Sequence, residues 1–181
     1  LANLMNESAL LTARRGKKII TMREVSESME RVIAGPERKG RVMNDKVKRT
    51  IAYHESGHAL VGHLIEHADP VHKISIISRG RALGYTLSIP DEDKVLNSLS
   101  EMKAELAVFM GGRVAEEIFC EDITTGASND LERASKMARA IVTQYGMSPL
   151  GTQVFGQPNH EVFLGRDYGN TQDYSEETAR R

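Results

Sequence analysis

Two histidines and a glutamate within one short segment are the residues best suited to chemistry. The segment from His54 to His58 reads HESGH, so the histidines are four residues apart and Glu55 follows the first. On an α-helix this spacing stacks both imidazoles on one face, where they can bind a single zinc ion and leave the glutamate near water on that ion. The HExxH pattern therefore predicts a zinc-dependent hydrolase in which Glu55 is the base and zinc-bound water attacks.

The flanking residues indicate which way the two histidines point. Ile51 and Ile65 lie on the same helical stripe as both imidazoles, so this stripe is expected to face the interior. The structural alternative is a pair of core histidines that only form hydrogen bonds, although the intervening glutamate has little packing reason to be there. A second i, i+4 pair, His63 and His67, lies on the opposite side of the helix and is predicted to face solvent.

A catalytic zinc needs a third protein ligand, and the spacing alone does not choose one. The elongated pattern HExxHxxGxxH is excluded, because Val61 and Leu64 stand where it requires glycine and histidine. Asp130 follows the small-residue segment 124–129 and opens a helix, so its carboxylate is either aimed at the metal or simply complements the helix dipole. The candidates for the third ligand are Glu116, Glu117, Asp122, Asp130 and His160.

Hydrophobic spacing, caps and breakers predict a mainly α fold with one small β-hairpin. Residues from 150 onward contain several glycines and are predicted to be loop-like. The expected helices span residues 2–15, 21–34, 44–67, 99–119 and 129–145, and the expected strands span residues 71–78 and 81–89.

Composition excludes several classes of protein. The chain has 181 residues, 24 Lys and Arg against 25 Asp and Glu, and one cysteine, so neither a dominant nucleic-acid surface nor an internal disulfide framework is expected. The basic run 38–49 could bind phosphate, but a solvated linker is favoured because no aromatic residues interleave the charges. No apolar run approaches the roughly 20 residues of a membrane span. Because the chain begins at Leu1, it is expected to be a piece of a longer protein.

Four segments resemble the peptidase domain of the FtsH family, which comprises membrane-anchored, ATP-dependent zinc proteases of bacteria and organelles. The resemblance implies that residues 1–36 are the end of an AAA lid subdomain and that residues 37–181 are a C-terminally truncated, helical zinc metallopeptidase domain. The matching segments are AYHESGHALV (52–61), GGRVAEE (111–117), TTGASNDLERA (124–134) and VFLGRD (162–167).

The resemblance also implies a role for each residue of the site. His54, His58 and Asp130 would bind one zinc ion, and Glu55 would be the catalytic base. Glu116 would hold one of the histidine ligands through an outer carboxylate contact, whereas its structural alternative is an exposed helix acid. Periodicity does not favour Glu116 over the glutamate that follows it.

The substrates would be unfolded or membrane proteins, and an extended segment of the substrate would pair with the strand at Leu83, Gly84, Tyr85 and Thr86. From composition, a hairpin that merely covers the core is an equally good interpretation. The resemblance further implies a homo-hexamer, and a bacterial inner-membrane or organelle-membrane anchor in the full-length protein, with a soluble, cytoplasm-facing peptidase domain. ATP would be used by an AAA domain, since this chain has no GxxxxGK[ST] phosphate loop.

Two other classes of function remain as alternatives. A zinc-stabilised assembly module would keep the metal and have no use for a base beside it. A nucleic-acid adaptor would use the basic run 38–49, and the balanced net charge of -1 argues against it.

Overall fold

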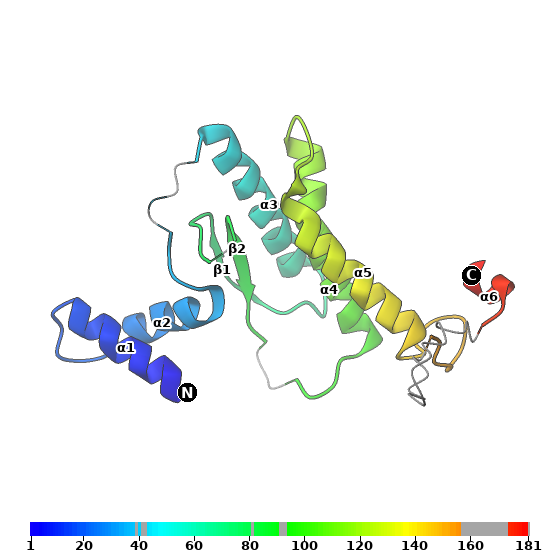
Figure 1. The fold of residues 1–181 in the computed structure, drawn as a ribbon, viewed down its shortest axis with the longest axis horizontal. Coiled ribbons are helices and arrows are strands. Elements are labelled where there is room, and N and C mark those ends of the chain that lie inside the picture. Colours follow the sequence, from blue (N-terminus) through cyan, green and yellow to red (C-terminus); the bar gives the residue numbers. More distant parts are fainter. Residues whose placement is uncertain (39, 41–42, 81, 91–93, 157–173, 181) are drawn as a thin grey trace, which may run out of the picture.

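The computed structural model describes residues 1–38, 40, 43–80, 82–90, 94–156 and 174–180 (Figure 1). Within these ranges the chain is mainly helical with one two-stranded antiparallel sheet, so the predicted fold class is confirmed. None of the described helices is both long and apolar enough to cross a membrane. The elements are α1 (Ala2–Arg14), α2 (Met22–Ala34), α3 (Asp45–Leu64), β1 (Val71–Ser75), β2 (Tyr85–Ser88), α4 (Leu99–Phe119), the 3₁₀ turn η1 (Thr125–Ala127), α5 (Ser128–Thr143) and α6 (Glu176–Arg180).

Local side-chain contacts fix where three of the helices begin. Glu24 accepts a hydrogen bond from the backbone N–H of Thr21 at 3.2 Å, which closes a capping box at the start of α2. Glu101 accepts one from the backbone N–H of Ser98 at 2.7 Å and caps α4 in the same way. At α3 the Asn44 side chain accepts from the backbone N–H three residues later at 2.8 Å. These contacts satisfy backbone donors that the first helical turn leaves unpaired.

Two glycines bring α3 and α4 into direct backbone contact. A Cβ atom on Gly57 would lie 2.3 Å from the carbonyl oxygen of Gly111, and one on Gly111 would lie 2.8 Å from that of Gly57. Only residues without a Cβ atom allow this approach. Both helices also carry buried apolar side chains, among them Ile51 on α3 and Met102 and Phe109 on α4, so much of the core lies along this helix pair.

The hairpin is shorter than the sequence predicts. Strands were expected over 71–78 and 81–89, but the ladder pairs Ile74 with Thr86 and continues only over Val71–Ser75 and Tyr85–Ser88. After Ser75 the chain no longer pairs with β2. The carbonyl oxygen of Ser78 instead accepts a hydrogen bond from the backbone N–H of Arg38 at 2.9 Å. The segment before α3 thus replaces the outer part of the predicted ladder.

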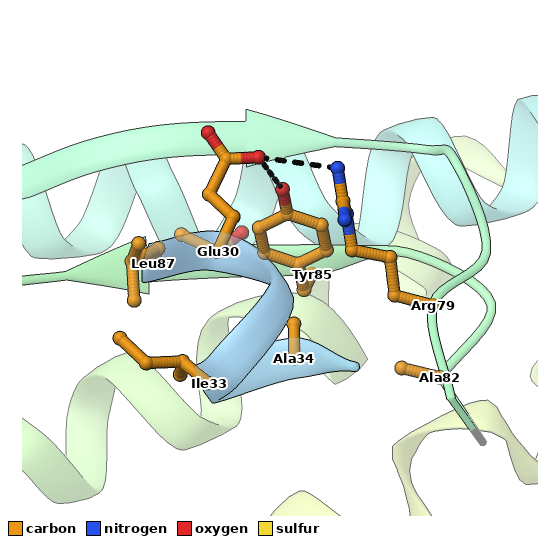
Figure 2. A pocket seen from close by; sticks show the side chains of 8 residues that line it. Glu30, Ile33, Ala34, Arg79, Ala82, Tyr85 and Leu87 are labelled. Carbon is orange, nitrogen blue, oxygen red and sulfur yellow. Dashed lines mark hydrogen bonds and ion pairs between the residues drawn. The ribbon is translucent and has the colours of Figure 1, made fainter. Parts of the chain in front are cut away.

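Helix α2 packs on this hairpin through buried charged groups (Figure 2). Glu30 of α2 accepts a hydrogen bond from the hydroxyl group of Tyr85 at 2.9 Å. The same carboxylate forms ion pairs with Lys73 at 2.5 Å and with Arg79 at 3.3 Å. Helix α2 is therefore joined to the hairpin by specific contacts. The predicted division into a lid end (1–36) and a peptidase domain (37–181) stays a prediction.

Two helix predictions need correction. The predicted helix 44–67 ends at Leu64, because Ile65 has extended backbone angles and His67 has a left-handed φ of 70°. The prediction of loop-like structure from residue 150 onward is wrong at α6, where Ser175 accepts a hydrogen bond from the backbone N–H of Thr178 at 3.2 Å. A serine followed by two glutamates is a helix-start signal that the glycine-rich surroundings obscured.

Candidate metal centre and catalytic site

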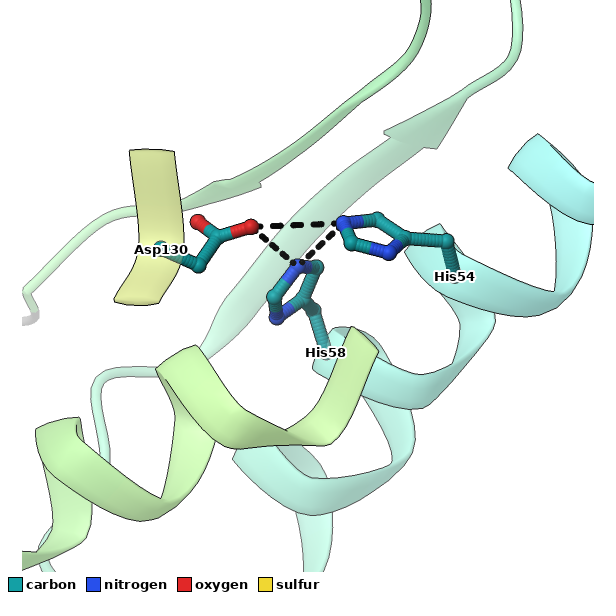
Figure 3. Close-up of side chains that lie close together, drawn as sticks. All are labelled: His54, His58 and Asp130. Carbon is teal, nitrogen blue, oxygen red and sulfur yellow. Dashed lines mark hydrogen bonds and ion pairs between the residues drawn. The ribbon is translucent and has the colours of Figure 1, made fainter. Parts of the chain in front are cut away.

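Helix α3 presents both histidines of the HExxH motif to the interior. Each is about nine-tenths buried, and their Nε2 atoms lie 3.0 Å apart. Asp130, in the first turn of α5, faces the same point (Figure 3): its Oδ2 atom lies 3.3 Å from His54 Nε2 and 3.4 Å from His58 Nε2. Among the described residues, these three form a group whose ligand atoms all lie within 4.8 Å of one another.

The outer nitrogen atoms of both imidazoles are already occupied. His54 Nδ1 lies 2.8 Å from a carboxylate oxygen of Glu116, and His58 Nδ1 lies 2.7 Å from the carbonyl oxygen of Val108. Because both partners are acceptors, each Nδ1 atom donates its proton outward, and each neutral ring turns an Nε2 lone pair toward Asp130.

Three electron-rich atoms that meet at such distances need a cation between them. A tetrahedral zinc ion with ligand distances of about 2.0–2.2 Å would separate its ligand atoms by about 3.3–3.6 Å. The observed separations of 3.0, 3.3 and 3.4 Å are close to this range. The residues present therefore fit a zinc site, and the outward hydrogen bonds are those that fix histidine ligands in known sites.

A glycine on α4 provides room for the His54 and His58 rings at the proposed zinc site. A Cβ atom on Gly112 would lie 2.5 Å from His58 Nε2 and 2.6 Å from His54 Cε1. Any side chain there would overlap with the atoms that face the metal position. The close α3–α4 crossing thus places backbone, without a side chain, beside the two imidazoles.

Glu116 connects the histidine helix to the segment that carries Asp130. Its second carboxylate oxygen accepts a hydrogen bond from the backbone N–H of Thr124 at 2.7 Å. The Thr124 hydroxyl in turn accepts from the N–H of Gly126 at 3.1 Å, and η1 then leads into α5. Because Glu116 is 1% exposed, the contact is shielded from water.

Mutual attraction dominates the electrostatics of the three groups. Burial opposes the charged form of Asp130, but the adjacent imidazoles of His54 and His58 lower its pKa well below the usual range, because either ring donates to the carboxylate when its Nε2 atom is protonated. Burial likewise disfavours the charged form of His54, yet its contacts with Asp130 and Glu116 raise its pKa. The lowered pKa of Asp130 and the raised pKa of His54 both show that a positive charge is favoured where the three side chains meet.

Glu55 lies beside the centre and contacts the hairpin. Its side chain is buried, and burial raises its pKa even though a hydrogen bond from Thr86 acts against this. The Thr86 hydroxyl lies 2.8 Å from Glu55 Oε2 and 3.0 Å from the Glu55 carbonyl oxygen. A Cβ atom on Gly84 would lie 2.9 Å from the Glu55 side chain, so this glycine provides the room for it. A carboxyl group with a raised pKa suits proton transfer near neutral pH.

The other candidates for a third ligand lie elsewhere. Glu117 is exposed and forms an ion pair with Arg113 at 2.8 Å, one helix position away from the buried Glu116. Asp122 is exposed, and His160 lies outside the described residues. The matched segment VFLGRD (162–167) also lies outside them.

The remaining sequence predictions concern histidines and the substrate strand. His63 and His67 are both exposed, as expected. Of the four proposed strand residues, Leu83 and Gly84 precede β2 and the other two lie in it. Strand β2 pairs with β1 on one edge, and within the described ranges no second strand covers its other edge.

Two residues that contact the histidines, Val108 and Gly112, were not predicted from the sequence. The Val108 carbonyl that holds His58 has no side-chain signal, since any residue supplies one. The role of Gly112 was signalled only by the adjacent glycines at 111 and 112 within a helix, an unusual choice because glycine weakens helices.

Comparison with known proteins agrees with this geometry. The sequence profile of Peptidase family M41 matches residues 41–181. The chain is 77% identical to the ATP-dependent zinc metalloprotease FtsH of Slackia heliotrinireducens, over 100% of this chain and 23% of that protein. It is 57% identical to the ATP-dependent zinc metalloprotease FtsH 1 of Thermoanaerobacter sp., over 99% of this chain and 30% of that protein.

A third relative gives the same picture. The ATP-dependent zinc metalloprotease FtsH of Rubrobacter xylanophilus is 55% identical over 99% of this chain and 28% of its own length. The chain thus spans between 23% and 30% of the length of these relatives. The resemblance to the FtsH proteases is confirmed over the length of the chain, and the chain belongs to peptidase family M41.

Proposed function

We propose that this chain is the proteolytic part of a zinc-dependent endopeptidase. The observation that carries the proposal is the triangle of His54 Nε2, His58 Nε2 and Asp130 Oδ2, with sides of 3.0, 3.3 and 3.4 Å. Three protein ligands leave one position of a tetrahedral zinc ion for water or substrate, as catalytic sites require and closed structural sites do not. The buried Glu55 beside the triangle supplies the base that a merely structural zinc would not need.

The chemistry divides between the metal and this chain's own residues. Zinc, when bound, supplies the Lewis acid that polarises the scissile carbonyl and makes water easier to deprotonate. Glu55 takes the proton of the attacking water and then returns it to the leaving nitrogen. Thr86 holds the Glu55 carboxylate through the 2.8 Å hydrogen bond, and Glu116 keeps His54 in the tautomer that turns Nε2 toward the metal.

The substrate we propose is an extended, unfolded polypeptide. A peptide that adds to the free edge of β2 at Leu83–Thr86 would form main-chain hydrogen bonds there, with little dependence on its sequence. The same strand carries Thr86, so substrate pairing and the Glu55 contact would share one element. This geometry favours cleavage of chains that are already unfolded.

The wider protein would supply the remaining functions. The names of the relatives support an ATP-dependent zinc protease. We propose that an AAA domain outside this chain uses the ATP and that the protein has no nucleic-acid partner. We further propose a homo-hexamer, anchored in a bacterial inner membrane or an organelle membrane by a segment outside this chain, with the peptidase domain facing the cytoplasm. Within this chain, α1 and α2 precede the family match, and α2 contacts the hairpin through Glu30.

The test combines metal analysis with one substitution. We expect one zinc ion per chain, an anomalous signal at the zinc edge between the three proposed ligands, and slow cleavage of unfolded casein. Glu55→Gln should keep the zinc ion and the fold but lose hydrolysis, by about 100-fold or more, because an amide does not accept the proton. Glu66→Gln is the matched control, since Glu66 follows the same helix and its side chain is 90% exposed.

Three results would contradict the proposal. Hydrolysis that persists in Glu55→Gln would exclude this residue as the base. A zinc ion bound with Asp130 pointing away would refute the ligand set. Zinc that binds without any hydrolysis by the wild-type protein would instead favour the assembly-module alternative.

A further inference from the structure

Glu30 is a buried carboxylate that the proposed mechanism does not use. It lies on α2, is 5% exposed, and belongs to a segment outside the family match at 41–181. Its polar side-chain partners among the described residues all lie on the hairpin. They are Lys73 on β1, and Arg79 in the connection and Tyr85 on β2, the last two of which Figure 2 shows. Arg79 also forms an ion pair with Glu37 at 2.8 Å, so two carboxylates and two cations balance in this cluster.

The partners of Glu30 adjoin the groups that hold the proposed base. Tyr85 and Thr86 are consecutive in β2, and successive side chains of a strand point to opposite faces. The Tyr85 hydroxyl donates to Glu30 on α2 at 2.9 Å, and the Thr86 hydroxyl lies 2.8 Å from the Glu55 carboxylate on α3. Strand β2 is therefore fixed from two sides, by α2 through one residue and by α3 through the next.

We propose that Glu30 is a positioning residue: through Tyr85 and Arg79 it holds β2 at the distance from α3 at which Thr86 reaches Glu55. This inference rests on the proposed function of Glu55 as the base. It means that the working unit of the peptidase includes α2, and does not begin where the family match begins.

The cluster is suited to such a role because it resists displacement. Arg79 is 4% exposed, and its guanidinium donates to the Gly35 carbonyl oxygen at 3.4 Å as well as pairing with Glu30 and Glu37. Moving α2 away from the hairpin would separate Glu30 from Lys73, Arg79 and the Tyr85 hydroxyl together, so several charge-assisted hydrogen bonds would be lost at once. The contact thus keeps one arrangement of β2, and misplacement of catalytic groups by about 1 Å can cost roughly 100-fold in rate.

The experiment compares three variants of the purified, zinc-loaded protein. Glu30→Gln keeps the shape of the side chain and removes its charge, and Tyr85→Phe removes only the hydroxyl group. Glu27→Gln is the matched control, because Glu27 lies one turn earlier on α2 and pairs with Arg15 instead of the hairpin. For each variant we would measure kcat and KM on an unfolded peptide, zinc content, the thermal midpoint, and amide hydrogen exchange over residues 83–88.

We expect Glu30→Gln and Tyr85→Phe to lower kcat by about 10- to 100-fold while zinc content stays at the wild-type value. Hydrogen exchange over 83–88 should speed up in both variants and not in the control. The kcat of the double variant should be no lower than that of the more impaired single variant, since both substitutions break the same chain of contacts.

Two outcomes would show that the inference is wrong. In the first, Glu30→Gln leaves hydrogen exchange over 83–88 unchanged. In the second, it lowers kcat only as far as the control does at an equal thermal midpoint. Should the wild-type protein cleave nothing, the proposed function fails, and the exchange data still decide whether Glu30 positions β2.

Discussion

Glu116 reaches across from α4 to place a carboxylate oxygen 2.8 Å from Nδ1 of His54 on α3. The two residues are 62 positions apart in the sequence, and both are buried. The other oxygen of the same carboxylate accepts the backbone N–H of Thr124, in the segment that leads to Asp130. One side chain thus aligns two of the three proposed zinc ligands.

This arrangement predicts that Glu116→Ala weakens zinc binding while Glu117→Ala does not. Loss of Glu116 frees the His54 ring and the Thr124 amide together, and outer partners of this kind are typically worth 10- to 100-fold in metal affinity. Glu117 is a suitable control because its side chain is 52% exposed and pairs only with Arg113 among the described residues. Competition with a zinc-binding dye measures both affinities. Equal affinities in the two variants would show that the contact with His54 does not tune the metal.

The choice between these two glutamates shows what the sequence can predict. The HExxH pair and the capping boxes at Thr21 and Ser98 are local signals, so their geometry follows from helix spacing alone. Adjacent positions on a helix differ by only about 100°, and both acids follow an apolar stretch, so which one faces α3 depends on the helix crossing. That crossing is set by contact between Gly57 and Gly111, which no periodicity reveals.

Asp130 is a similar case. On local grounds it is an ordinary first-turn acid, and only the family resemblance favoured it as a ligand. Its position depends on how η1 and α5 fold back onto α4, a tertiary relationship. The predicted hairpin strands are also too long because of a tertiary contact. Ser78 pairs with Arg38, which comes from a segment distant in the sequence.

A second prediction separates the candidate carboxylate ligands. Asp130→Asn should lower zinc affinity and abolish the rise in thermal midpoint that zinc produces, because a neutral amide oxygen is a weaker ligand. Asp122→Asn should behave as wild type, since Asp122 is exposed on the segment after α4. The measurement is the thermal midpoint of each protein with a chelator and again after zinc is restored. A zinc-dependent midpoint that survives in Asp130→Asn would move the third ligand elsewhere.

A third prediction concerns the space beneath the imidazoles. Gly112→Ala adds a methyl group 2.5 Å from His58 Nε2, and hydrogen bonds to Glu116 and Val108 prevent the rings from moving aside. Alanine is a better helix former than glycine by about 1 kcal/mol, so α4 itself would not weaken. We therefore expect a folded protein with little bound zinc, measured by circular dichroism and elemental analysis. Gly40→Ala is the control, because a Cβ atom there would meet nothing within 4 Å. Full zinc occupancy in Gly112→Ala would show that the rings are not fixed.

The last prediction concerns Glu24 and the stability of the α1–α2 pair. The Glu24 side chain is fully buried and forms ion pairs with Arg15 at 3.1 Å and with Lys17 at 2.7 Å. Hydrogen bonds from Lys17 and from both the hydroxyl and the backbone N–H of Thr21 outweigh desolvation and lower the pKa of Glu24 well below its ordinary value of 4.5. The folded state therefore binds fewer protons than the unfolded state. Its extra stability is fully present above about pH 4.5 and is lost as pH falls below that value.

Glu24→Gln should accordingly lower the thermal midpoint at pH 7, and the difference from wild type should shrink as pH approaches 3. Glu66→Gln, whose side chain is 90% exposed, should show no such pH-dependent difference. Amide hydrogen exchange over residues 2–34 reports the same loss locally, because the two helices make most of their contacts with each other. A difference that stays constant or grows as the solution becomes acidic would mean that the charge of Glu24 does not stabilise the pair. The capping geometry alone would then account for its burial, since glutamine can still accept the Thr21 N–H.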